Sequence, residues 1–294
     1  MPILPFIFPV MRLLGATVVL SLVGLLPQQA KAEPLVDSPQ TFSQPGPEAS
    51  PWAGTLEFYG LIPWADTTTT VRGFESSTAL NPSLIFGQLL QSAIAVRASG
   101  EYQRIGLLTD VSYTQLGAEP SRSTARGLLS GKSTVTSING IYDLALRYRL
   151  GDREAAVGQP GQFTLVPYAG VRLVEAQLVV AAELNGQGPG GRQYAQQGSL
   201  SHTWAQPLVG LQGSVFLSPK LRAFARGDIA GFGLAGAQDL SGNAQLGLGY
   251  AVGNSTTLNV SMRYFGQAWN NGASPDNGYT SHQYGPEVSL KLFF

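Results

Sequence analysis

The chain has 294 residues, with 18 lysines and arginines against 18 aspartates and glutamates, and no cysteine. Charged residues make up 12% of it, about half the usual share of soluble domains. The lack of cysteine excludes a disulfide scaffold, Cys-ligated zinc and thiol catalysis, and zero net charge leaves no electrostatic footprint for nucleic acid. Only two histidines are present, His202 and His282, so we expect no cofactor and no metal.

The N-terminus resembles an export signal. Arg12 precedes an apolar run over 13–26, and the small-residue box Ala30-Lys31-Ala32 follows it. We therefore expect a cleaved signal peptide over 1–32, cut between Ala32 and Glu33; a retained membrane anchor is the alternative.

The start of translation and the segment after the signal peptide give two further expectations. Translation could begin at Met1 or at Met11. Residues 33–51 contain five prolines, which forbid a helix or a strand ladder and predict a flexible periplasmic segment.

From 52 to 294 the chain alternates apolar and polar residues with period two, in runs separated by Gly, Pro, Asn and Ser. At 256–264 the even positions are Thr, Leu, Val, Met and Tyr, and the odd positions between them are Thr, Asn, Ser and Arg. Such runs predict ten strands, at 53–64, 92–102, 104–116, 133–150, 162–184, 202–217, 220–233, 240–252, 255–267 and 282–294. Counts of eight or twelve stay open, because 65–91 and 162–184 could each contain a hairpin.

This pattern predicts an all-β fold: a closed antiparallel transmembrane β-barrel with both termini periplasmic. A soluble sandwich also alternates, but these runs are long enough to cross a bilayer when tilted. Aromatic residues fall near strand ends on the apolar face, as in interfacial girdles: Trp52, Tyr102, Tyr113, Tyr264 and Tyr284. Lipid leaves no strand edge unpaired, so 56–62 should pair antiparallel with 288–294.

The connections sort by length. Tight turns are expected at 103, 218–220 and 253–254, with 151–161 somewhat longer, and the other set is mostly long, as for external loops. Within 65–91, Asn81-Pro82 favours a helix start. That short apolar helix would plug the mouth or lie on the membrane surface; an ordinary ordered loop is the alternative.

The polar faces of the predicted strands carry many charges. The candidates for the lumen lining are Glu57, Arg97, Glu101, Asp110, Asp143, Arg147, Arg172, Arg222, Arg226, Asp228, Arg263, Glu287 and Lys291. Arg149 belongs to the same faces. We expect paired charges to plug a lumen of this size; a narrow, mildly anion-preferring pore is the alternative.

No catalytic residue is predicted. A surface hydrolase is conceivable, since His202 lies beside Ser201 and His282 beside Ser281, with the acids Asp66, Glu119, Asp239 and Asp276 in outer loops or at strand ends. An adhesin acting through 65–91 and 185–201 is a further alternative. The expected partners are outer-membrane lipid, small solutes or anions, and the barrel-assembly machinery, which would engage the final strand ending at Phe294.

Several short runs carry a family resemblance: PLVG at 207–210, RGDIAGFG at 226–233, GLGY at 247–250, MRY at 262–264 and GP at 285–286. With these, the chain resembles a family of uncharacterised outer-membrane β-barrel proteins of Gram-negative, cyanobacterial type, over most of 54–294. It departs from that pattern at Ala230, usually Gly, and at 81–90, which lacks the usual acids. The resemblance implies the fold and an outer-membrane location, and no substrate.

Overall fold

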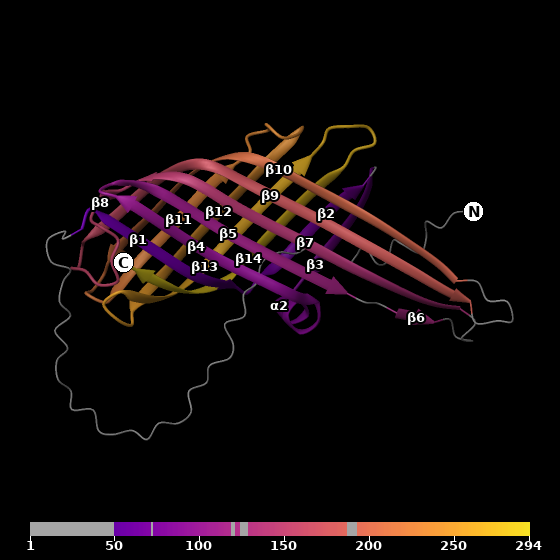
Figure 1. Ribbon diagram of the computed structural model, residues 1–294, viewed down its shortest axis with the longest axis horizontal. Helices are drawn as coiled ribbons and strands as arrows, with labels where there is room; N and C mark the ends of the chain where they lie inside the picture. Colours follow the sequence, from indigo (N-terminus) through magenta and orange to yellow (C-terminus); the bar gives the residue numbers. More distant parts are fainter. Residues whose placement is uncertain (1–49, 72, 119–120, 124–128, 187–192) are drawn as a thin grey trace, which may run out of the picture.

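The computed structural model describes residues 50–71, 73–118, 121–123, 129–186 and 193–294. The expected signal peptide and most of the proline-rich segment lie outside these residues. Within them, ten long antiparallel strands form a closed barrel (Figure 1). These strands are β1 (Trp52–Leu61), β4 (Leu90–Tyr102), β5 (Ile105–Ala118), β7 (Leu129–Tyr148), β9 (Phe163–Gly186), β10 (Gln193–Phe216), β11 (Leu221–Ala230), β12 (Gln238–Ala251), β13 (Thr256–Asn270) and β14 (Gly278–Phe293). The predicted barrel of about ten strands is confirmed.

The first and last strands close the ring. β1 pairs antiparallel with β14, from Thr55 opposite Phe293 to Leu61 opposite Glu287. Beyond this ladder, Gly54 N donates to Phe294 O at 2.7 Å and Phe294 N donates to Gly54 O at 3.0 Å. The Phe294 ring lies where a Cβ on Gly54 would be, so a larger residue at this position would have to displace the ring. The predicted pairing of the terminal strands is confirmed.

The hairpin that stayed open as an alternative within 65–91 is present, so this region is not an ordinary ordered loop. β2 (Trp64–Val71) and β3 (Phe74–Leu80) form a hairpin, and β14 passes from β1 to β2, with Tyr284 opposite Trp64. The hairpin therefore extends the barrel wall. The region contains too many adjacent threonines and serines for a period-two pattern to show. The expected hairpin alternative within 162–184 is not realised, because β9 runs through it unbroken.

A helical segment follows β3. It comprises α2 (Pro82–Leu84) and the π-helical turn η2 (Ile85–Leu89). Asn81 caps it, since its Oδ1 accepts from Leu84 N at 2.9 Å, and the predicted helix start is confirmed. Among the described strands β3 pairs only with β2, and η2 fills the space between β3 and β5. It does so through a buried apolar cluster of Ala65, Leu80, Ile85, Leu89 and Leu116, so the helix seals the wall and neither plugs the mouth nor lies apart on a surface.

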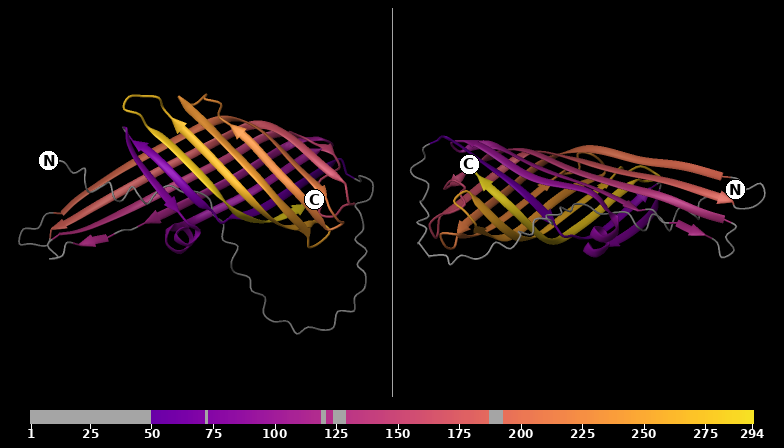
Figure 2. Two further views of the ribbon diagram at one scale, coloured as in Figure 1. Left: turned by 180° about the vertical axis from the view of Figure 1, so that it is seen from behind. Right: turned by 60° about the horizontal axis from the view of Figure 1, so that its bottom comes forward.

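The two ends of the barrel differ. At one, the terminal end, β1 begins, β14 ends and the connections 103–104, 217–220 and 252–255 are tight, as predicted. At the other, the loop end, β7, β9 and β10 run well past the remaining strands (Figures 1 and 2). The short strands β6 (Ser121–Ser123) and β8 (Leu150–Gly151) pair with β7 and β9.

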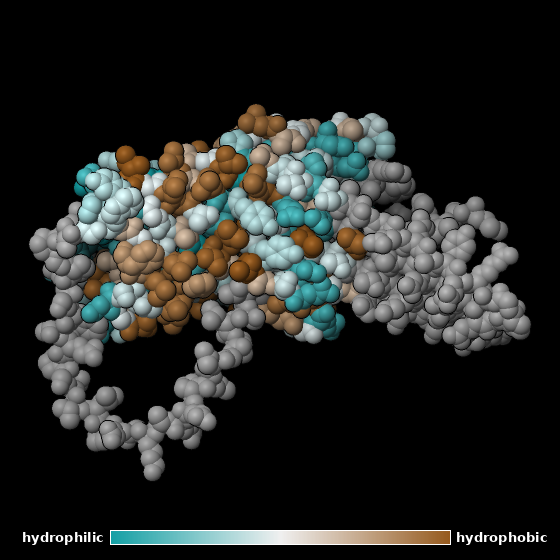
Figure 3. All heavy atoms as spheres, in the orientation of Figure 1, coloured by the Kyte–Doolittle hydropathy of each residue, from teal (hydrophilic) through white to brown (hydrophobic). Residues whose placement is uncertain are grey.

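Alternate side chains point out of and into the barrel. On β12, Leu246 is 67% exposed, while its neighbour Gln245 is buried. Apolar side chains gather on the outer face over the part of the barrel nearer the terminal end (Figure 3). Exposed aromatic rings flank this surface: Trp64, Tyr264 and Tyr284 toward the loop end, and Trp52, Tyr102, Tyr148 and Tyr250 at the terminal end. An apolar band between aromatic girdles is the exterior of a barrel that faces lipid. No helix of the described residues is long and apolar enough to cross a membrane.

Candidate functional site in the barrel interior

The centre of the interior is organised around Asp110 of β5. Its Oδ2 lies 2.9 Å from Arg97 Nε and 2.7 Å from Arg226 Nη1. Its Oδ1 accepts from the Tyr59 hydroxyl at 2.7 Å. The Arg97 guanidinium in turn lies 4.6 Å from the centre of the Tyr59 ring. One carboxylate therefore holds β1, β4 and β11 against β5.

A second cluster adjoins it through Arg172 of β9. Arg172 makes a two-pronged contact with Asp143, with both N–O distances 2.7 Å, and reaches Asp228 at 2.9 Å. Asp228 also accepts from the Tyr168 hydroxyl at 3.0 Å. Two-pronged arginine–carboxylate pairs fix geometry as well as charge, so this cluster is rigidly placed.

A third cluster lines β13, β14 and β1. Arg263 Nη1 lies 3.0 Å from Glu287, and Arg97 links it to the first cluster through Glu57 at 3.2 Å. Glu57 also accepts from Asn259 at 3.2 Å. Ion pairs of this kind overcome the cost of removing charges from water only when further hydrogen bonds satisfy their remaining atoms, and the neighbouring amides and hydroxyls provide these.

The connection between β8 and β9 adds a residue that no strand pattern indicates. Glu154 folds into the terminal end, 2.8 Å from both Arg147 and Lys291. Burial favours the neutral form of Glu154, but Lys291 and Arg147 outweigh it and hold the pKa of this carboxyl well below its usual range. Nearby, Glu101 pairs with Arg147 at 3.3 Å and with Arg149 at 2.8 Å. Glu154 thus fixes the connection across the terminal end.

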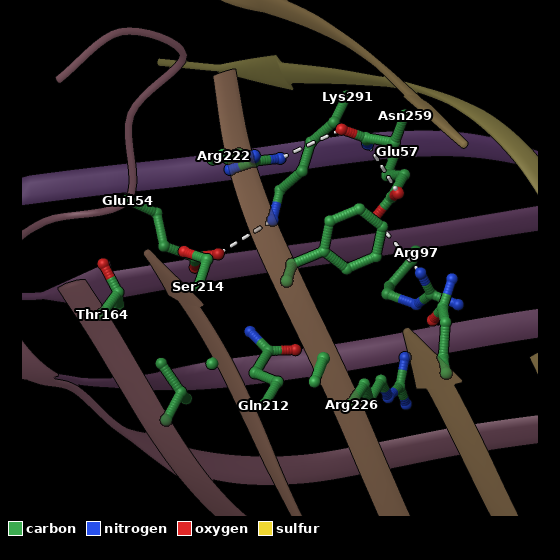
Figure 4. A pocket seen from close by; sticks show the side chains of 15 residues that line it. Glu57, Arg97, Glu154, Thr164, Gln212, Ser214, Arg222, Arg226, Asn259 and Lys291 are labelled. Atoms are coloured by element: carbon green, nitrogen blue, oxygen red, sulfur yellow. Dashed lines mark hydrogen bonds and ion pairs between the residues drawn. The ribbon is translucent and has the colours of Figure 1, made fainter. Parts of the chain in front are cut away.

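A small cavity of about 50 Å³ remains between the central and terminal clusters (Figure 4). Its charged lining consists of Arg97, Arg222, Arg226, Lys291, Glu57 and Glu154. Arg222 is buried there and hydrogen bonds to two neutral groups, the Thr257 hydroxyl and the Asn259 amide oxygen, each at 3.3 Å.

The structure places all the candidate lining residues in the interior. Eleven of them form ion pairs with one another in these clusters. Lys291 pairs with Glu154 instead. Arg222 is also in the interior, but in the described chain no carboxylate lies within 4 Å of it. Reasoning from the sequence missed Glu154 as a lining residue. It also gave no role to Tyr59 and Tyr168, although Tyr59 lies on the polar face of its strand, which could have indicated an inward hydroxyl.

The two histidines do not share a site. The His202 ring lies on the inner face, 5.2 Å from the Trp204 ring and 4.3 Å from the Trp269 ring, centre to centre. His282 is exposed on the outer face, where Nδ1 and the Tyr264 hydroxyl are 2.7 Å apart. Ser281, its chain neighbour, is buried and bonded to Thr67 at 2.9 Å. No hydrogen bond joins either histidine to a serine or carboxylate in the described residues, and Glu119 lies outside them.

Comparison with known proteins adds the following. No family model and no curated protein matches the sequence. The outer membrane protease OmpT from Escherichia coli is similar over 83% of this chain and 97% of its own, with 10% identity and a TM-score of 0.48. Neisserial surface protein A is similar over 83% and 97%, with 14% identity and a TM-score of 0.24. Ail of Yersinia pestis is similar over 82% and 99%, with 10% identity and a TM-score of 0.22. Likenesses this low carry no activity over to this chain.

Proposed function

We propose that the protein is an integral barrel of the bacterial outer membrane whose interior is closed to solutes and which works through its loop end, as a structural or interaction protein. The apolar, aromatic-flanked exterior supports the membrane location. An outer-membrane barrel enters from the periplasm, which fits the export signal expected over 1–32. In this orientation the terminal end is periplasmic and the loop end is extracellular.

The observation that carries the closed interior is contact across the barrel. Arg226 of β11 reaches Asp110 of β5, although three strands, β7, β9 and β10, separate them around the ring. Toward the loop end, Asn139 of β7 donates to the Tyr279 hydroxyl of β14 at 3.4 Å. Side chains that touch across the barrel at these two levels support a closed interior.

The interaction role is supported by the length of three strands. β7 has 20 residues and β9 and β10 have 24 each, whereas a tilted strand crosses the hydrocarbon core with about 9–11 residues. Roughly half of β9 and β10 therefore extends beyond the membrane as a paired sheet. Such a sheet is a firm platform for a partner, unlike a long loop.

The proposed role involves no catalysis, because each histidine points to the opposite face from its neighbouring serine and, within the described residues, makes no hydrogen bond to a serine or a carboxylate. The final strand, ending at Phe294, is the segment that the barrel-assembly machinery would engage. Deleting Phe294 should slow assembly into membranes, since its hydrogen bonds with Gly54 complete the seam.

Planar bilayer recording tests the closed interior. The refolded protein should give no discrete channel events, whereas a narrow pore would show salt-dependent steps with a preference for anions. A variant with both N139A and R226A is the matched positive control, because it removes both of these cross-wall contacts while keeping Asp110. Regular conductance steps from the unaltered protein would refute the closed interior and favour the anion-preferring pore.

A shortened hairpin tests the interaction role. Gln177 and Ser201 lie opposite each other on β9 and β10, so an Asn-Gly turn can join the strands there. The shortened barrel should fold, yet it should fail to restore partner binding to cells that lack the protein. Full restoration would refute a role for the extension.

A further inference from the structure

The cavity beside Arg222 has an excess of positive charge. Four cations line it, Arg97, Arg222, Arg226 and Lys291, against two carboxylates, Glu57 and Glu154. The charges of Arg226 and Arg97 are also balanced by Asp110, which pairs with both but does not line the cavity. Lys291 pairs with Glu154 at 2.8 Å. Arg222 is the cation left over.

Arg222 is only 4% exposed. Within the described chain no carboxylate lies within ion-pair distance of it, its Nη2 meets only neutral oxygens, and its Nε has no hydrogen-bond partner. The Phe293 ring, 5.0 Å from the guanidinium carbon, contributes a weak cation–π contact. A buried, unpaired guanidinium is costly, so a counter-charge is expected beside it.

A second orphaned donor lines the same cavity. Arg97 Nη2 is buried and has no hydrogen-bond partner. Ser214 and Gln212 of β10 also line the cavity and supply neutral groups on the wall opposite (Figure 4). Two unmatched guanidinium donors with neutral groups around them make a site for a negative ligand, because amides and hydroxyls can also donate to an anion.

We propose that this cavity binds a small inorganic anion of the chloride class, held by Arg222 and Arg97. A volume of about 50 Å³ is large enough to admit such an ion. Water would satisfy the orphaned Nε but would leave the charge of Arg222 uncompensated. This inference goes beyond the proposed function and does not depend on it, since a closed or a conducting interior can hold the ion.

The backbone beside Arg222 is adapted to its position. Gly249 of β12 lies directly opposite Arg222 in the β11–β12 ladder. A Cβ on Gly249 would lie 2.9 Å from Arg222 Nε, closer than real Cβ contacts allow. The glycine therefore leaves room for the guanidinium to lie beside the β12 backbone.

The test measures thermal unfolding of the refolded barrel in sodium chloride and in sodium gluconate, at one ionic strength. Chloride should raise Tm, and above its dissociation constant each tenfold increase should raise the folded-to-unfolded ratio about tenfold. R222Q should abolish the chloride dependence. R263Q is the matched control, because Arg263 is paired with Glu287 and does not line the cavity; it should lower Tm in both salts and keep the dependence.

Equal Tm values in chloride and gluconate, or a dependence that R222Q retains, would overturn the proposal. A second measurement needs no variant. Crystals of the unaltered protein grown in bromide should show an anomalous peak beside Arg222. If fully occupied bromide sites appear elsewhere in the crystal but none appears beside Arg222, the proposal is also overturned. Neither result bears on conductance, which tests the closed interior separately.

Discussion

Arg226 and Asp110 meet in the middle of the barrel, with Nη1 and Oδ2 2.7 Å apart, from strands on opposite walls. Asp110 also binds Arg97 and Tyr59, so one carboxylate connects two guanidinium groups and a phenol. The interior of this barrel is thus held together through side chains as well as through the strand ladder.

Replacing Asp110 tests how much this carboxylate contributes. D110N leaves two buried guanidinium groups without their shared partner, and removing one member of a buried pair costs about 3–5 kcal/mol. Urea titration of the refolded barrel should show a loss of this size in the free energy of unfolding. S112A is the control, because Ser112 also faces inward on β5 but its hydroxyl has no hydrogen-bond partner; its effect should stay within about 0.5 kcal/mol. Equal stability of the two variants would contradict the central role of Asp110.

The seam can be locked covalently. Phe58 of β1 lies directly opposite Leu290 of β14, and opposed residues of antiparallel strands have Cα atoms about 4.5–5.5 Å apart, within the range for a disulfide. Since the chain has no cysteine, F58C/L290C should oxidise to one intramolecular bridge, detected as a linked peptide by mass spectrometry. F58C/L248C, with the second cysteine on β12, should not. Bridging in neither variant would indicate that β1 and β14 do not meet.

Acidification should weaken the connection held by Glu154. Its pKa in the folded protein is lowered, so the carboxylate contributes stability that is complete above the ordinary pKa of 4.5 and is lost as pH falls toward the folded value. At pH 7, E154Q should cost about 1.5–3 kcal/mol, as for hydrogen bonds to charged groups. The difference between the unaltered protein and E154Q should shrink below pH 4.5. A difference that is constant or grows as pH falls would be inconsistent with the ion pairs to Arg147 and Lys291.

The helical seal between β3 and β5 depends on its buried side chains. Ile85 is 1% exposed within the apolar cluster, so I85A should lower the free energy of unfolding by about 2–5 kcal/mol. The exposed Gln88 on the same turn provides the control, because Q88A should change it by about 0.5 kcal/mol or less. If both variants unfold at the same urea concentration, the segment does not seal the wall.

Much of this fold follows from period two alone. Alternation located the ten strands, and their inward parity identified Asp110, Arg172 and the other interior charges. The partners of those charges could not be predicted, because contacts across the barrel depend on the stagger of the strands, which no local pattern encodes. Nor could Glu154, which lies in a connection without period. The hairpin of β2 and β3 stayed one of several open alternatives, because its run of threonines shows no apolar face.

A barrel in lipid requires one face of each strand to meet the acyl chains, and single cysteines on β12 test this directly. Leu246 points outward and its neighbour Gln245 inward. A fluorophore on L246C should be quenched by lipids that carry brominated acyl chains, and L246C should resist a water-soluble maleimide in vesicles. A fluorophore on Q245C should not be quenched. Equal quenching at the two positions, or rapid maleimide labelling of L246C in vesicles, would contradict a barrel with lipid outside and charges within.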